Sequence, residues 1–271
     1  MRFYHPEYNI DVNTEDLSCR IILTEINKIY KKIPKTKCEK CPGKKKVESD
    51  CCKTFSPPML FSEFINIVNN VLKNKSDVEI KELIVASVKT FLDISDVKKC
   101  VLLEKNRCIV YEQRPFSCRM FGLYSSEEWS DRLKKISEHK KCKTEELPFY
   151  KQCKGINKTG KTKKISRFHS DILFRDLHDL DVKIFPDDKI GKKFVFQSKT
   201  YMPFYVHFLL INLGPQMLEN LAIIREDLEK TVENFKNKEI EKESLDKKIE
   251  QVSDFIKTFE ESFLREKNNG W

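Results

Sequence analysis

Ten cysteines are the feature that most constrains this chain of 271 residues. The N-terminus, MRFYHPEYNI, has no apolar segment of the kind that a secretory signal needs, so we expect the chain to stay in the reducing cytoplasm. A framework of disulfides is not expected in that compartment. Many clustered cysteines in a reduced protein indicate a bound metal instead.

The distribution of the cysteines supports this interpretation. Nine of them fall into three groups, and most stand beside Lys, Arg, Pro or Gly rather than on apolar faces. The groups are Cys38, Cys41, Cys51 and Cys52; then Cys100, Cys108 and Cys118; then Cys142 and Cys153. The tenth, Cys19, lies inside a helical apolar pattern, where a buried cysteine acts as a small hydrophobic residue. We therefore expect the nine to ligate metal and Cys19 to pack.

The first group has the spacing of a metal knuckle. Cys38-Glu-Lys-Cys41 is followed by Pro42-Gly43, and this spacing lets two thiolates converge on one cation. Cys51 and Cys52 would point apart on extended backbone, so they suit a larger cluster or two sites better than one mononuclear site. Thiolate ligands bind both metals, and the pattern favours an iron–sulfur cluster of the 4Fe–4S type, with zinc as the alternative.

The second group carries a longer motif. The sequence from Cys108 reads CIVYEQRPFSCRMF, Cys100 opens the run CVLL, and the Cys51-Cys52 pair precedes both. The pattern resembles the YkgJ-type cysteine-cluster family, a zinc- or iron-chelating domain whose CxxCxxCC hallmark precedes C-x-I-Y-x-x-R-P-x-x-C-R-x-F. The chain departs from it by a longer spacer, residues 42–50, before the cysteine pair. The resemblance covers residues 38–153.

The resemblance implies a metal-chelating protein. It implies that the first seven of the nine cysteines are ligands and that Cys142 and Cys153 match as late cysteines. Members are known as iron–sulfur oxidoreductases, and a flagellin lysine methylase carries a related cluster. An oxidoreductase or a protein-modifying, methylase-like enzyme is therefore implied, and the motif does not identify the substrate.

Three further residues of the motif are candidates for a role beside the metal. Arg114 can bond loop carbonyls around the cysteine site, or it can hold a substrate carboxylate or phosphate bidentately. Arg119, next to a ligand candidate, adds a second cation that favours an anionic site. We expect Tyr111 to pack rather than to donate a proton.

The net charge of +9 is concentrated in two stretches that overlap cysteine groups. Residues 31–46 hold eight Lys and one Glu, and residues 140–167 hold nine Lys, one Arg and two Glu. Solvated lysines on loops explain both stretches. The alternative is a zinc-stabilised binding module, in which these loops with Phe149, Tyr150 and Phe168 contact nucleic acid or an acidic protein.

The remaining pattern predicts a mostly α fold with a loop-rich cysteine core and a few short strands. Apolar periodicity predicts helices capped by Thr14, Ser62 and Asp77, a helix with a capping box at Ser125 and Glu128, and a short helix at 172–180. Short strands are predicted at 108–111 and 193–196, with a turn at 185–188.

The C-terminal part predicts an antiparallel helical hairpin. A heptad-like apolar stripe follows Gly214-Pro215, and a second stripe repeats every three or four residues from Leu245 to Phe263. We expect a cysteine-cluster domain over 1–200 and the hairpin over 201–271. The hairpin packs on the main domain or presents its phenylalanines to a partner protein. The best apolar run, residues 204–213, is shorter than the roughly 20 residues of a membrane span.

Overall fold

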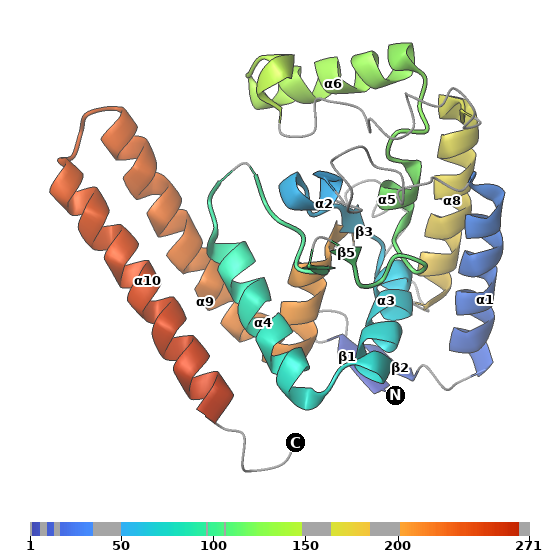
Figure 1. Cartoon of the computed structure of the whole chain (residues 1–271), viewed down its shortest axis with the longest axis horizontal. Helices are drawn as coiled ribbons and strands as arrows, with labels where there is room; N and C mark the ends of the chain where they lie inside the picture. The colour runs from blue at the N-terminus through green and yellow to red at the C-terminus, as the bar shows by residue number, and fades with distance from the viewer. Residues whose placement is uncertain are drawn as a thin grey trace. The chain divides into compact units, whose positions relative to one another are not determined.

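The computed structural model describes residues 2–5, 10–13, 17–34, 50–95, 97–105, 107–147, 164–184 and 201–265. These residues are mostly helical, which confirms the expected fold class (Figure 1). The helices are α1 (Leu17–Lys32), α2 (Asp50–Thr54), α3 (Phe61–Asn74), α4 (Asp77–Leu92), α5 (Phe116–Met120), α6 (Ser126–Lys140), the 3-10 helix η2 (Thr144–Glu146), α8 (Arg167–Ile184), α9 (Phe204–Lys236) and α10 (Lys242–Arg265). No helix among the described residues is both long and apolar enough to cross a membrane.

The strands are short and pair two by two. They are β1 (Arg2–His5) with β2 (Ile10–Asn13), β3 (Pro58–Met59) with β6 (Met202–Pro203), and β4 (Leu103–Glu104) with β5 (Arg107–Cys108). The β3–β6 and β4–β5 pairs are antiparallel. The turn expected at 185–188 and the strand expected at 193–196 lie outside the described residues.

The chain divides into two compact units. Unit 1 comprises Met1–Phe3, Asp11–Val71 and Val97–Phe204, and unit 2 comprises Tyr4–Ile10, Leu72–Asp96 and Tyr205–Trp271. All cysteines whose side chains the structure describes lie in unit 1. Helix α4 belongs to the same unit as the C-terminal helices.

The core of unit 1 is built from helices whose apolar faces the sequence predicts. Helix α1 buries Ile22, Ile26 and Ile29, and it ends just before Pro34. It packs against α8, which buries Leu173 and Leu177 on the predicted face. Apolar residues at helical spacing therefore place both helices against one core.

Helix α3 begins at Phe61, one residue before the expected cap. The Ser62 amide donates instead to Asp181 Oδ1 of α8 at 2.6 Å, so a carboxylate from another helix satisfies this end. Glu63 reaches back to the Leu60 amide at 3.0 Å. A long-range acceptor thus replaces the local serine cap that the sequence predicts.

The Arg-Pro motif folds differently from its prediction. Strand β5 ends at Cys108, and turns occupy residues 109–113 where a strand to Tyr111 was expected. Pro115 is the N-cap of α5, so Cys118 lies inside a short helix. In place of a longer strand, the backbone turns: the Ile109 amide donates to the Leu102 carbonyl, and the Gln113 amide donates to the Val110 carbonyl.

Unit 2 contains α4, all of α9 after Phe204, and α10. Ser76 caps α4 in a capping box with Glu79, one residue before the expected cap. Helices α9 and α10 run antiparallel and are joined by the Asp227–Lys248 ion pair (Figure 1). Helix α10 packs on α4, where Lys89 bonds Glu260 at 2.6 Å.

The C-terminal helices differ from the prediction in two ways. Helix α9 includes the apolar run 204–213 and kinks at Gly214, whose φ of 80° and ψ of 169° are not helical. On α10 the stripe is unevenly buried, because Val252 is 7% exposed while Ile249 is 50% exposed.

Candidate metal centre

Five of the predicted ligands come from four separate segments of unit 1. Cys51 and Cys52 lie in α2, Cys100 lies in the loop before β4, Cys108 ends β5 and Cys118 lies in α5. We call these five the cysteine cluster. Their charges act on one another: Cys51, Cys100 and Cys108 all raise the pKa of Cys118, and Cys100 and Cys118 raise that of Cys52. These electrostatic effects indicate that the four segments lie near one another.

A backbone hydrogen bond ties two of these segments together. The Cys100 amide donates to the Cys52 carbonyl at 2.7 Å. This bond holds the loop of Cys100 against the last turn of α2, next to the cysteine pair. The Cys100 side chain is buried, and the other four cysteines of the cluster are partly exposed.

The Cys51–Cys52 pair corrects an expectation. On extended backbone, the side chains of Cys51 and Cys52 would point apart. The two residues lie in α2 instead. Their Sγ atoms are 4.0 Å apart. Two thiolates bound to one tetrahedral zinc at about 2.3 Å would lie about 3.8 Å apart. The helical backbone therefore lets both thiols approach one metal ion.

The surroundings set the protonation of these thiols. The hydrogen bond from Cys52, helped by the Arg114 charge, lowers the pKa of Cys51 to about 7. The same bond raises the pKa of Cys52, because its proton is held against the neighbouring sulfur. Burial raises the pKa of Cys100 to about 12 and also raises the pKa of Cys118. A bound cation would displace these protons, since metal-ligating thiols are deprotonated.

Arg114 supplies positive charge beside the cluster. The residue is 8% exposed, and its Cζ lies 4.0 Å from the centroid of the Tyr111 ring. Its charge lowers the pKa of both Cys51 and Cys118. The stacked ring holds the guanidinium where it favours thiolate, the form that binds metal.

Arg119 makes the carbonyl contacts that the sequence argument considered for Arg114. Its Nε donates to the Arg114 carbonyl at 2.8 Å, and its Nη2 donates to the Glu112 carbonyl. Its Cζ also lies 4.0 Å from the centroid of the Tyr30 ring. Arg119 thus fixes the loop that carries Arg114.

Glu63 is a residue of this region that sequence reasoning missed. It is 0% exposed, and its Oε1 accepts hydrogen bonds from the Tyr30 hydroxyl at 2.5 Å and from the Phe116 amide at 2.6 Å. Burial raises the pKa of Glu63, and its hydrogen bonds oppose that shift. A signal was present, because Glu63 sits between Phe61 and Phe64 on an apolar helix face. The carboxyl anchors the first turn of α5, which carries Cys118.

The other predicted ligands are not joined to the cluster by the described contacts. Cys38, Cys41 and Cys153, and the side chain of Cys19, lie outside the described residues. Cys142 follows α6, and its amide donates to the Ser137 carbonyl at 3.1 Å. Within the part of the chain that the structure describes, no three His, Cys, Asp or Glu side chains form an assembled metal-binding group.

Comparisons with protein-family models, with curated proteins and with solved structures found no match for the chain. The resemblance to the cysteine-cluster family therefore stays an expectation based on the motif.

Proposed function

We propose that the chain is a metal-chelating cysteine-cluster protein. Cys51, Cys52, Cys100, Cys108 and Cys118 act as ligands in this proposal, and Cys38 and Cys41 extend the set from the preceding knuckle. The observation that carries it is the 4.0 Å approach of the Cys51 and Cys52 Sγ atoms, with the Cys100 amide bonded to the Cys52 carbonyl and the buried cation of Arg114 helping to lower the pKa of Cys51. Burial and the neighbouring cysteines raise the pKa of Cys118, so thiolates at these positions repel one another, and a bound cation would remove that repulsion.

An iron–sulfur cluster of the 4Fe–4S type is the proposed group, and zinc is the alternative. The Sγ separation of 4.0 Å in the cysteine pair is compatible with either. A cluster would supply one-electron chemistry, as an oxidoreductase needs, while zinc would hold the surrounding loops in place. Arg114 would neutralise part of the charge of an anionic thiolate set in both cases.

Metal analysis of the protein as purified under anaerobic conditions tests the proposal. A broad brown absorption with bound iron and sulfide supports the iron–sulfur cluster, and colourless protein with stoichiometric zinc supports the alternative. A double Cys51→Ser and Cys52→Ser variant should lose the metal, whereas Cys19→Ser, outside the three groups, should keep it. Wild-type protein that holds neither iron nor zinc would overturn the proposal.

One described residue favours the second candidate function, a zinc-stabilised module that binds nucleic acid. Phe168, at the start of α8, is 75% exposed next to Arg167 and close after the basic stretch. Exposed aromatic rings beside cations stack on unpaired bases. Binding of single-stranded nucleic acid that falls steeply with added salt and weakens in Phe168→Ala would support this function. Absence of binding at low salt would exclude it.

A further inference from the structure

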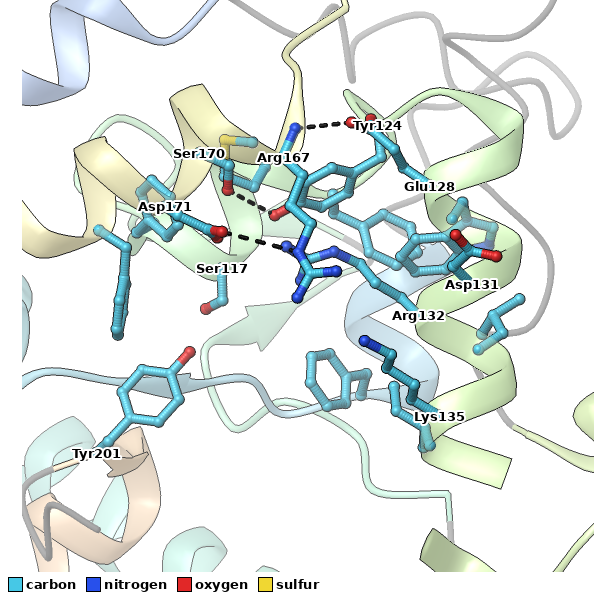
Figure 2. Close-up of a pocket in the computed structure, with 18 residues that line it drawn as sticks. Ser117, Tyr124, Glu128, Asp131, Arg132, Lys135, Arg167, Ser170, Asp171 and Tyr201 are labelled. Carbon is cyan, nitrogen blue, oxygen red and sulfur yellow. Dashed lines mark hydrogen bonds and ion pairs between the residues drawn. The ribbon is translucent and has the colours of Figure 1, made fainter. Parts of the chain in front are cut away.

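A second candidate site lies in unit 1 beside α5. A pocket of about 580 Å³ lies between α5, α6 and α8 (Figure 2). Phe116 and Ser117 of α5 line it, and so does Tyr201 before β6. No cysteine whose side chain the structure describes lines the pocket. Its volume is in the range of small-molecule sites.

The walls of the pocket are largely aromatic. The rings of Tyr124 and Trp129 are nearly parallel, with an interplanar angle of 16° and centroids 6.5 Å apart. On the α8 side, Phe174 contacts both Phe116 and Tyr201, with centroid distances of 5.6 and 5.5 Å. These faces and edges suit a flat ring better than an aliphatic chain.

Cations point into the same space from two facing helices. Figure 2 shows the side chains of Arg132, from α6, and Arg167, from α8, extending toward each other, with Lys135 below them. Arg132 stacks on Tyr124, with its Cζ 4.1 Å from the ring centroid. An anion placed between the two guanidinium groups would accept hydrogen bonds from both.

Three carboxylates, Glu128, Asp131 and Asp171, line the pocket with its three cations, so the formal charge of the lining is balanced. Asp171 pairs with Arg167 at 3.7 Å. Glu128 accepts the Arg167 and Ser125 backbone amides, and these hydrogen bonds, with the Arg132 charge, lower its pKa. Arg132 makes no ion pair within the described part of the chain, and its Nε is buried without a hydrogen-bond acceptor there. A buried donor of this kind is costly unless a ligand supplies an acceptor.

We propose that this pocket binds a planar aromatic molecule that carries one anionic group. The ring lies against the aromatic walls, and the carboxylate, sulfonate or phosphate accepts hydrogen bonds from Arg132 and Arg167. The paired hydroxyls of Tyr124 and Ser170, 3.0 Å apart, add polar contacts on the α8 side. This arrangement of apolar walls with a few convergent polar groups is typical of small-molecule sites.

The tryptophans of the chain allow a direct test. Trp129 lines the pocket and Trp271 is the only other tryptophan, so Trp271→Phe leaves one fluorophore at the site. The probes are anilinonaphthalene sulfonate, a planar aromatic anion, and N-phenylnaphthylamine, its uncharged analogue. We expect energy transfer from Trp129 to both probes, with tighter binding of the anion.

Substitution of Arg132 tests the contribution of its charge to probe binding separately from that of the aromatic walls. Arg132→Gln should weaken anilinonaphthalene sulfonate binding about tenfold and leave N-phenylnaphthylamine binding unchanged, because one charge-assisted contact is lost. Arg132→Lys should restore part of the affinity. The matched control is Arg175→Gln, an exposed arginine of α8 outside the pocket, which should bind both probes as the parent does.

Two results would overturn the proposal. One is equal affinity of the parent protein for the two probes. The other is the same response of the Arg132→Gln and Arg175→Gln variants to the anionic probe. If Arg132→Gln loses both probes through misfolding, Arg167→Gln replaces it, since that residue is exposed. Unchanged anilinonaphthalene sulfonate affinity in Arg167→Gln would then contradict the proposal.

Discussion

The Tyr30 hydroxyl donates a hydrogen bond of 2.5 Å to Glu63 Oε1, and both residues are buried. The bond joins α1 to α3, and the same carboxyl oxygen accepts the Phe116 amide of α5. One buried carboxyl therefore connects three helices of unit 1. The Arg119 guanidinium stacked on the Tyr30 ring brings the Arg-Pro loop into the same network.

Tyr30→Phe should destabilise the protein by about 1–3 kcal/mol, because it leaves a buried Glu63 oxygen with one donor fewer. The matched control is Tyr201→Phe, which makes the same chemical change in a residue that is 36% exposed. Its free energy of unfolding should change by less than about 0.5 kcal/mol. Urea unfolding of the three proteins measures this, and equal stabilities would contradict the network.

Glu63→Gln should flatten part of the pH dependence of stability. Burial raises the pKa of Glu63 in the folded protein above that of the unfolded chain. Its contribution is therefore fully present below the unfolded pKa, about 4.3, and is lost as the pH rises through the folded pKa. The difference in unfolding free energy between wild type and Glu63→Gln should shrink from pH 4 toward neutral pH. A difference that grows with pH would show that the hydrogen bonds outweigh burial.

Local patterns account for the parts of the fold that could be predicted. The capping box of Ser125 and Glu128 forms as expected, and Leu83, Ile84 and Val88 of α4 are buried as their spacing predicts. These signals span a few residues and depend only on the helix period. Residues far apart in the chain decide the rest.

The missed features depend on such distant partners. The Glu63 carboxyl accepts a hydrogen bond from the amide of Phe116, which lies 53 residues further along the chain. Arg132 lies on the polar side of the α6 pattern, and only the packing of α8 turns it toward Arg167. The same holds for the short helix of Cys51 and Cys52, because five residues are too few to show a helical period.

The cysteine cluster predicts a difference among cysteine variants. Cys108→Ser and Cys118→Ser should abolish metal loading and give insoluble protein, because each leaves an incomplete thiolate set. Cys153→Ser should keep most of the metal, and Cys19→Ser nearly all of it. Metal content per chain decides this, and full loading of Cys118→Ser would show that the Arg-Pro motif is not the metal site.

Gly214→Ala should destabilise the protein by about 1–3 kcal/mol. The φ of 80° and ψ of 169° at this position belong to a region that is open almost only to glycine. A Cβ would meet nothing within 4 Å, so the cost is conformational rather than steric against neighbours. The control is Gln216→Ala in the exposed first turn after the kink, which should unfold at the wild-type temperature.

Val252→Ala should cost about 1–2 kcal/mol, and Ile249→Ala should cost less than about 1 kcal/mol. Both lie on the predicted apolar stripe of α10, but only Val252 is buried. Thermal unfolding of the two variants compares them directly. If both lose the same stability, the stripe forms a uniform interface instead.

The hydrogen bonds accepted by Glu63 and Asp181 join residues that are far apart in the chain, and this separation matters during synthesis of the protein. Phe116 follows Glu63 by 53 residues, and at about 5–20 residues per second the ribosome needs roughly 3–11 seconds to make that stretch. Asp181 follows Ser62 by 119 residues and comes later still. Cys51 and Cys52 therefore leave the ribosome well before α5 has been made. In the proposed site, a metal delivered to the nascent chain would meet an unfinished ligand set until translation has passed Cys118.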